Sequence, residues 1–175
     1  MHQLNLTDFD ESERRDYMTV VAIMAGADGK VTSEEILALR ELCKRFVLGP
    51  SARGRVMGAA TVPPHDLEEI LSRLAETPLR YSLLLDVASM AYRDEVLAPE
   101  EQVEYDYLSN KLGVPEAHSK AIMSFAESIF QPGYTPAKAS ENLNKLERSG
   151  IPRAAVSLCA SLQALGLTSQ VEVNH

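Results

Sequence analysis

The sequence predicts an all-α fold, a compact bundle of about seven to nine helices with an internal pseudo-repeat of helical hairpins. Three observations favour this class. Apolar residues recur at helical spacing along nearly the whole chain, and Gly and Pro residues interrupt that spacing at short intervals. In addition, one stretch of sequence matches another stretch 66 residues further along without a gap.

The first five expected helices are separated by recognisable breaks. The spacing predicts helices over 11–27, 33–47, 51–60, 65–76 and 79–92. The first two flank the turn segment "ADGKVTSEE", and the later ones are separated by Gly49-Pro50, Pro63-Pro64 and Pro78. The short connections indicate that consecutive helices pack as neighbours.

Four further helices are expected in the second half, over 99–112, 115–130, 136–148 and 153–165. Gly113 with Pro115, the segment 131–133, and Gly150 with Pro152 mark the breaks between them. The last two helices form an apolar hairpin that we expect to close the domain. We treat residues 1–175 as one domain, with repeat one at 15–57, repeat two at 81–123 and a C-terminal helical extension at 132–175.

The repeat is carried by apolar and acidic residues together. The identities include Val21/Val87, Ala22/Ala88, Met24/Met90, Ala25/Ala91, Asp28/Asp94, Glu34/Glu100, Glu35/Glu101, Leu42/Leu108 and Met57/Met123. Core-type matches are expected of any two helical hairpins, but hydrophobic patterning does not require the acidic ones.

Composition and charge exclude several classes of function. The net charge of −8 repels phosphate backbones, so nucleic acid is not expected as a partner, whereas cations and basic protein surfaces are. No apolar run approaches the roughly 20 residues of a membrane span, and the polar N-terminus differs from a signal peptide. We therefore expect a cytoplasmic protein without direct membrane insertion. Cys43 and Cys159 lie far apart in apolar helical runs and are interpreted as buried free thiols.

The acidic motif can be explained by helix capping alone. Thr32 is well placed as an N-cap, and Glu35, three residues on, completes a capping box. In the second copy, Pro99 suits the first helical turn, and acidic residues there favour the positive end of the helix.

The same motif also suggests a cation site. Glu35 and Glu101 fall on the apolar faces of their helices, the first with Leu39, Leu42 and Phe46 and the second with Tyr105, Leu108 and Leu112. Ala98 has no side-chain oxygen, so a reciprocal cap does not explain Glu101. If the two hairpins pack about a pseudo-twofold axis, the carboxylates of Asp28, Glu35, Asp94 and Glu101 converge, and such oxygen ligands suit calcium, magnesium or manganese. Neither loop alone is an EF-hand, because the first two acidic positions of that loop are missing.

The stretch "MAGADGKVTSEE" and its echo "MAYRDEVLAPEE" resemble the tellurite-resistance TerB-like family over roughly residues 14–130. The resemblance implies a helical bundle with an acidic site for a divalent metal. It also implies a place in bacterial responses to tellurite and related stress, alongside protein partners. The implied metal ligands are Asp28, Glu35, Asp94 and Glu101, with Glu34 and Glu100 as further candidates. The second copy departs from the pattern at Glu95, where a Gly would follow the Asp.

Other features are given structural interpretations. No HExxH, GxSxG or phosphate-cradling glycine loop is found, so no catalytic residue is assigned. Gly49, Gly54 and Gly58 are interpreted as sites of close helix packing, with an anion site beside Arg53 and Arg55 as the alternative. Asp86 is expected at the surface, and the alternative is a supporting contact to the acidic site.

Three functions stay open at this stage. The preferred one is a non-enzymatic helical module that binds a divalent cation and acts through protein partners, with a homodimer also allowed. The second is a metal-dependent hydrolase acting on a phosphate-bearing substrate. The third is a structural interaction domain whose acidic motif only caps helices.

Overall fold

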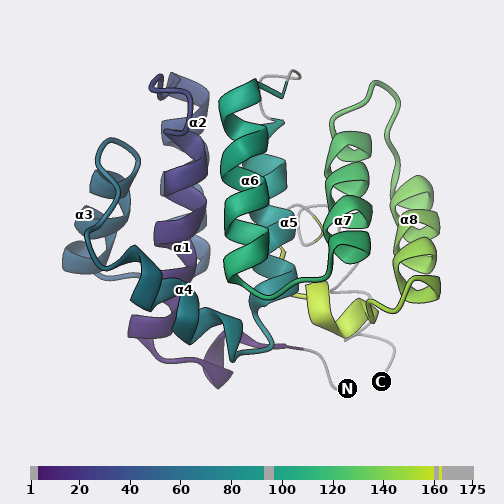
Figure 1. Cartoon of the computed structure of the whole chain (residues 1–175), viewed down its shortest axis with the longest axis horizontal. Helices are drawn as coiled ribbons and strands as arrows, with labels where there is room; N and C mark the ends of the chain where they lie inside the picture. The colour runs from purple at the N-terminus through teal and green to yellow at the C-terminus, as the bar shows by residue number, and fades with distance from the viewer. Residues whose placement is uncertain (1–3, 93–96, 160–161, 163–175) are drawn as a thin grey trace.

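The computed structural model describes residues 4–92, 97–159 and 162, and within these residues the chain is helical and contains no strand. The predicted all-α bundle is therefore confirmed (Figure 1). Its α-helices are α1 (Glu11–Ala25), α2 (Ser33–Arg45), α3 (Pro50–Ala59), α4 (Leu67–Ala75), α5 (Arg80–Ala91), α6 (Pro99–Lys111), α7 (Glu116–Ile129) and α8 (Pro136–Arg148). Two 3-10 helices, η1 (Leu6–Asp8) and η2 (Arg153–Val156), flank them.

Local chemistry sets where the helices begin and end. Asp10 caps α1, because its Oδ1 accepts the N–H of Glu13 at 2.9 Å. Thr135 caps α8 in the same way, and Pro occupies the first turn of α3, α6 and α8. At the other end, Gly113 follows α6 with φ of 70°, a left-handed conformation that favours glycine.

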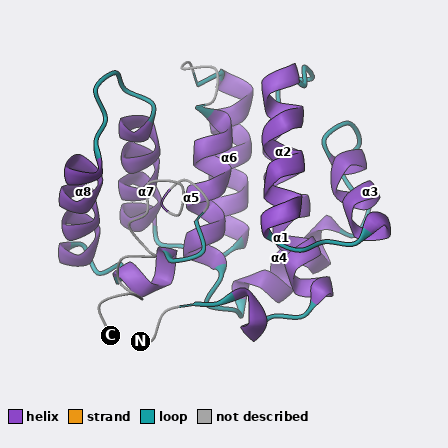
Figure 2. Cartoon of the chain, turned by 180° about the vertical axis from the view of Figure 1, so that it is seen from behind, coloured by secondary structure: helices purple, strands orange, loops and turns teal. Residues whose placement is uncertain are grey.

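Helices α1 and α5 form the centre of the bundle. They pack side by side, and every residue from Asp16 to Ala25 and from Ser82 to Ala91 is buried. A helix that is apolar on all sides requires cover on all sides, and here the surrounding helices supply it. The core is therefore organised around one pair of helices (Figures 1 and 2).

The internal repeat corresponds to two three-helix units. Unit one is α1–α3 and unit two is α5–α7, and α2 and α6 have bounds that differ by the 66-residue offset of the sequence repeat. In each unit the first helix packs against the third and the second, and the second packs against the third. The α1–α5 pairing joins the units, while α4 links them and packs on α1 and α6.

The C-terminal part differs from its prediction. An α-helix was expected over 153–165, but a 3-10 helix spans Arg153–Val156 and a turn follows it, while residues 160–161 and 163–165 lie outside the described part. Pro152 precedes the 3-10 helix. The apolar side chains of Val156 and Leu158, in the 3-10 helix and the turn after it, are buried. Helix α8 packs on α7, and η2 packs on α5 and α8, so this region closes one side of the bundle.

Across the described ranges, none of the helices is both long and apolar enough to traverse a lipid bilayer.

Candidate functional site: the acidic end of the bundle

Glu35 caps helix α2. Its Oε1 accepts the backbone N–H of Thr32 at 2.9 Å, and the Thr32 hydroxyl oxygen accepts the N–H of Glu35 at 3.1 Å. This reciprocal pair is a capping box, and it satisfies two amides at the start of the helix. The Glu35 side chain points inward as predicted, since only 2% of the residue is exposed.

Glu101 occupies the equivalent position in α6 and forms half of the same box. Its Oε1 accepts the N–H of Ala98 at 2.8 Å. The sequence argument that Ala98 rules out a capping role for Glu101 is therefore wrong. This half of the box uses the backbone N–H of the N-cap residue and does not depend on its side chain. Capping thus accounts for an inward glutamate in both copies.

The apolar faces that accompany these glutamates are confirmed. Leu39, Leu42 and Phe46 are buried in unit one, and Tyr105, Leu108 and Leu112 are buried in unit two. The Tyr105 hydroxyl donates to the carbonyl oxygen of Ser119 at 2.6 Å, which ties α6 to α7. Burial raises the pKa of this phenol well above its usual range.

The remaining predicted ligands are placed differently. Asp28 is exposed, and its Oδ1 accepts the N–H of Lys30 at 2.9 Å within the turn. Glu34 and Glu100 are exposed beside their capping glutamates. Asp94 lies outside the described residues.

The helices that carry Glu35 and Glu101 begin at the same end of the bundle. Helices α2 and α6 both start at the upper end of the view in Figure 1, and the Asp28 turn leads into α2 there. Within the described ranges, however, the side chains of His, Cys, Asp and Glu form no group of three that could hold a metal ion. The convergence of four carboxylates stays a prediction that involves Asp94.

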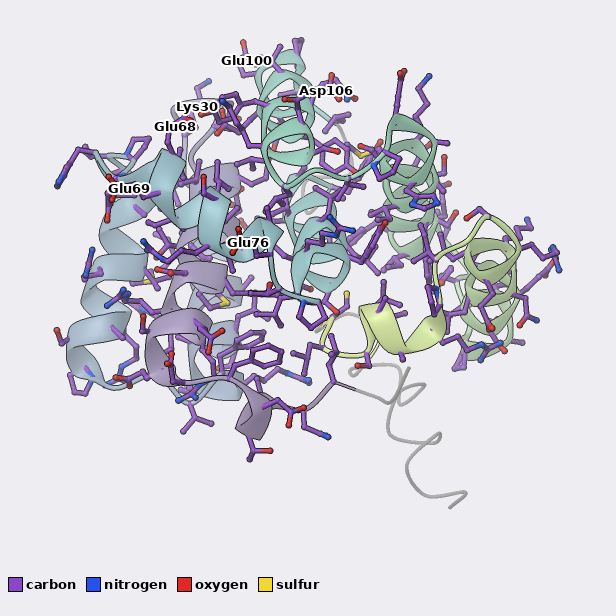
Figure 3. The ribbon with its side chains drawn as sticks, turned by 60° about the horizontal axis from the view of Figure 1, so that its bottom comes forward. Lys30, Glu68, Glu69, Glu76, Glu100 and Asp106 are labelled. Carbon is purple, nitrogen blue, oxygen red and sulfur yellow. The ribbon has the colours of Figure 1, made fainter. Side chains whose placement is uncertain are left out.

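Acidic side chains also lie on α4 and α6. Figure 3 labels Glu68, Glu69 and Glu76 of the α4 segment and Glu100 and Asp106 of α6, together with Lys30. Glu68 links the two helices: it accepts a 2.7 Å hydrogen bond from the Tyr107 hydroxyl and forms a 3.2 Å ion pair with Lys111. The hydrogen bond to the carboxylate raises the pKa of Tyr107 to about 12.

Sequence reasoning missed a buried polar cluster. Asp86 was expected at the surface but is only 3% exposed. Its Oδ2 accepts the Tyr17 hydroxyl at 2.5 Å, and its Oδ1 accepts the Cys159 thiol at 3.2 Å. One signal was available, because "YSLLLDVASMAY" has almost no polar face and such a helix is buried all round.

Both cysteines are buried free thiols, as predicted. Burial raises the pKa of Cys43, although the nearby Arg53 guanidinium opposes that effect.

Each three-helix unit also carries a groove between its second and third helices. The groove between α6 and α7 has a volume of about 680 Å³, and the α2–α3 groove has about 440 Å³. Several lining positions are equivalent in the repeat: Arg40/Asp106, Cys43/Ser109, Lys44/Asn110, Arg53/Ser119, Gly54/Lys120 and Met57/Met123. The two grooves thus share a position in the fold but differ in chemistry.

The glycines of α3 do not pack as expected. A Cβ added at Gly54 or Gly58 would meet nothing within 4 Å, so the prediction of close helix packing is wrong at both. Gly49 does approach another segment, because its N–H donates to Oε2 of Glu11 at 2.8 Å. The backbone of Gly26 packs closely on the end of α3, since a Cβ at Gly26 would stand 1.7 Å from the carbonyl oxygen of Ala60. This contact requires glycine.

Comparisons with protein-family models, with curated proteins and with solved structures give no match. The resemblance to the TerB-like family therefore depends on the motif residues alone, and the site residues that it implies remain expectations.

Proposed function

We propose that the chain is a non-enzymatic helical module that binds a divalent cation at its acidic end and acts through protein partners. The proposed cation is calcium, magnesium or manganese, held by Asp28, Glu35, Asp94 and Glu101 with help from Glu34 and Glu100. Following the resemblance to the TerB-like family, we place this activity in a bacterial response to tellurite and related stress.

The main support for the cation proposal is the placement of the two acidic motifs. The two acidic motifs stand at equivalent positions of two three-helix units, and both helices that they precede begin at the same end of the bundle (Figure 1). Carboxylate oxygens are the ligands that calcium, magnesium and manganese prefer. The N-termini of α2 and α6 carry partial positive charge, which repels a cation. Several carboxylates are therefore needed to bind a cation at this end.

Calorimetric titration of the whole chain with each of the three ions tests this proposal. We expect binding to the original chain and its loss in an Asp28→Asn, Glu34→Gln variant, whose substitutions leave both capping glutamates in place. The matched control is Glu41→Gln, which removes an exposed carboxylate from α2 away from this end. Absence of heat with all three ions, together with an unchanged melting temperature in chelator, would refute cation binding.

A second candidate is an interaction module that needs no metal. It is favoured by the hydrogen bonds of Glu35 and Glu101 to their N-cap amides, which give both glutamates a structural role. Under this alternative, Glu35→Ala, which removes the acceptor that glutamine would keep, lowers the melting temperature equally with and without metal. Under cation binding, the same change also reduces the rise that metal produces.

A further inference from the structure

The groove between α2 and α3 combines an exposed apolar rim with a sheltered floor. Leu37 of α2 is 61% exposed and lines the groove. Across the groove, Met57 of α3 is partly buried against the core, and Cys43 closes the floor. Leu37, Arg40 and Lys44 follow one face of α2, and Arg53 and Met57 follow the facing side of α3.

The charges around this groove oppose the charge of the chain. Arg40, Lys44 and Arg53 line it, against one acidic residue, Glu41, in a chain of net charge −8. Lys44 lies 3.5 Å from Glu41 in an exposed pair, whereas Arg40 and Arg53 form no ion pair with any residue in the described part of the chain. The groove is therefore a local positive region on an acidic molecule.

The internal repeat shows that the fold does not require these basic residues. At the equivalent positions of unit two, Asp106 replaces Arg40 and Ser119 replaces Arg53. Both units form the same helix pair, so packing and capping are satisfied with either set. The basic residues need an explanation outside the fold.

Gly54 is a second feature of the groove that bears on what could bind there. It lies in the middle of α3, where glycine costs about 1 kcal/mol relative to alanine. Nothing in the chain contacts the space above its Cα within 4 Å, so no close approach within the molecule requires it. Glycine at this position leaves that part of the groove without a side chain.

We propose that the α2–α3 groove binds an acidic amphipathic helix of a partner protein. The partner would place aliphatic side chains against Leu37 and Met57 and carboxylates against Arg40, Lys44 and Arg53, with its backbone approaching over Gly54. This is recognition of a helix in a groove, in which apolar anchors provide affinity and charge selects the partner. The inference rests on the partner-binding part of the proposed function and does not involve the cation.

The test uses the full chain in chelator and a defined probe. The probe is a fluorescent, end-blocked helical peptide of about four turns, with leucines along one face and glutamates along both edges. Its control is the same peptide with lysine in place of every glutamate. We expect the glutamate peptide to bind, the lysine peptide not to bind, and Arg53→Glu or Arg40→Glu to weaken binding by at least about tenfold.

Arg55→Glu provides the matched control, because Arg55 is an exposed cation of the same helix that does not line the groove. A Gly54→Leu variant should fold normally, since the added side chain enters open space, and should lose the peptide. Gly58→Ala, also in open space but outside the groove, should bind as the original chain does.

Four results would overturn the proposal. They are the absence of binding by the glutamate peptide, equal binding by the lysine peptide, an equal effect of Arg55→Glu, and self-association that Arg53→Glu abolishes. The last result would assign the groove to a second copy of the chain. Because chelator is present throughout, failure of cation binding leaves the outcome unaffected.

Discussion

The Tyr17 hydroxyl donates a 2.5 Å hydrogen bond to the Asp86 carboxylate, joining the two central helices of the bundle. Both residues are fully or almost fully buried, and Asp86 also accepts the Cys159 thiol. The contact between the two central helices therefore contains a buried polar cluster.

Replacing Asp86 with Val should destabilise the protein, even though Val20 occupies the equivalent position in unit one. The change leaves the Tyr17 hydroxyl buried without its acceptor, which costs about 1–3 kcal/mol. Combining it with Tyr17→Phe should cost less than the sum of the two single changes, because both members of the pair are then removed. Urea unfolding of the four proteins measures this coupling, and strict additivity would contradict it.

Ala98→Thr should stabilise the protein. Ala98 is the N-cap of α6 and has no side-chain oxygen, and the N–H of Glu101 donates to the carbonyl oxygen of Ala98 at 3.0 Å. A threonine there completes the box that Thr32 forms in unit one, with an expected gain of about 0.5–1 kcal/mol in the free energy of unfolding.

Thr32→Ala is the reciprocal control for this prediction and should lose about 1 kcal/mol. The change reduces α2 to the half box that α6 has now. If both variants unfold at the same urea concentration as the original chain, the side chain of the N-cap residue does not stabilise these helices.

Gly26→Ala should destabilise unit one by about 3 kcal/mol or more, because the new Cβ collides with the backbone of Ala60 and the neighbouring helix end must move. Gly54→Ala should instead stabilise by about 0.5–1 kcal/mol, since the site is open and helical. Thermal unfolding compares the two, and changes of the same sign would contradict the packing described at Gly26.

Stability should fall at alkaline pH. Burial raises the pKa of Tyr17, with the Asp86 carboxylate adding to the effect, and burial also raises the pKa of Tyr105. In the unfolded chain these phenols ionise near pH about 10, so above that pH the unfolded state loses protons that the folded state keeps. The stabilisation is complete below about pH 9 and is lost as the pH rises further.

Urea midpoints between about pH 8 and pH 11 measure this loss. A Tyr105→Phe variant should be less stable at neutral pH but should lose less stability over the alkaline range. Parallel curves for the two proteins would show that Tyr105 does not contribute to the pH dependence.

The helices and the repeat could be predicted from the sequence because their signals are local. Each predicted helix from 11–27 to 136–148 matches an observed one to within two residues at either end, since Gly, Pro and capping residues mark the boundaries. The inward orientation of Glu35 and Glu101 followed from helical periodicity alone.

The errors arose where distant segments decide the outcome. Asp86 is buried because Tyr17 and Cys159, far away in sequence, come to meet it. The openness around Gly54 depends on which face of α3 the rest of the bundle leaves uncovered. At the acidic site, the capping box of Glu35 was predicted from Thr32, but the hydrogen bond from the Ala98 N–H to Glu101 was missed because the argument considered only the Ala98 side chain.

The pairing of α1 with α5 has a consequence for how the surface can vary. A half-length chain with three helices would leave the long apolar side of its first helix in water, and two such chains would hide it against each other. In the present chain the two units belong to one polypeptide, and α1 and α5 bury these sides against each other. In a symmetric dimer every exposed residue must serve both copies, whereas fusion releases each half to specialise, as the exchange of Arg40 for Asp106 illustrates.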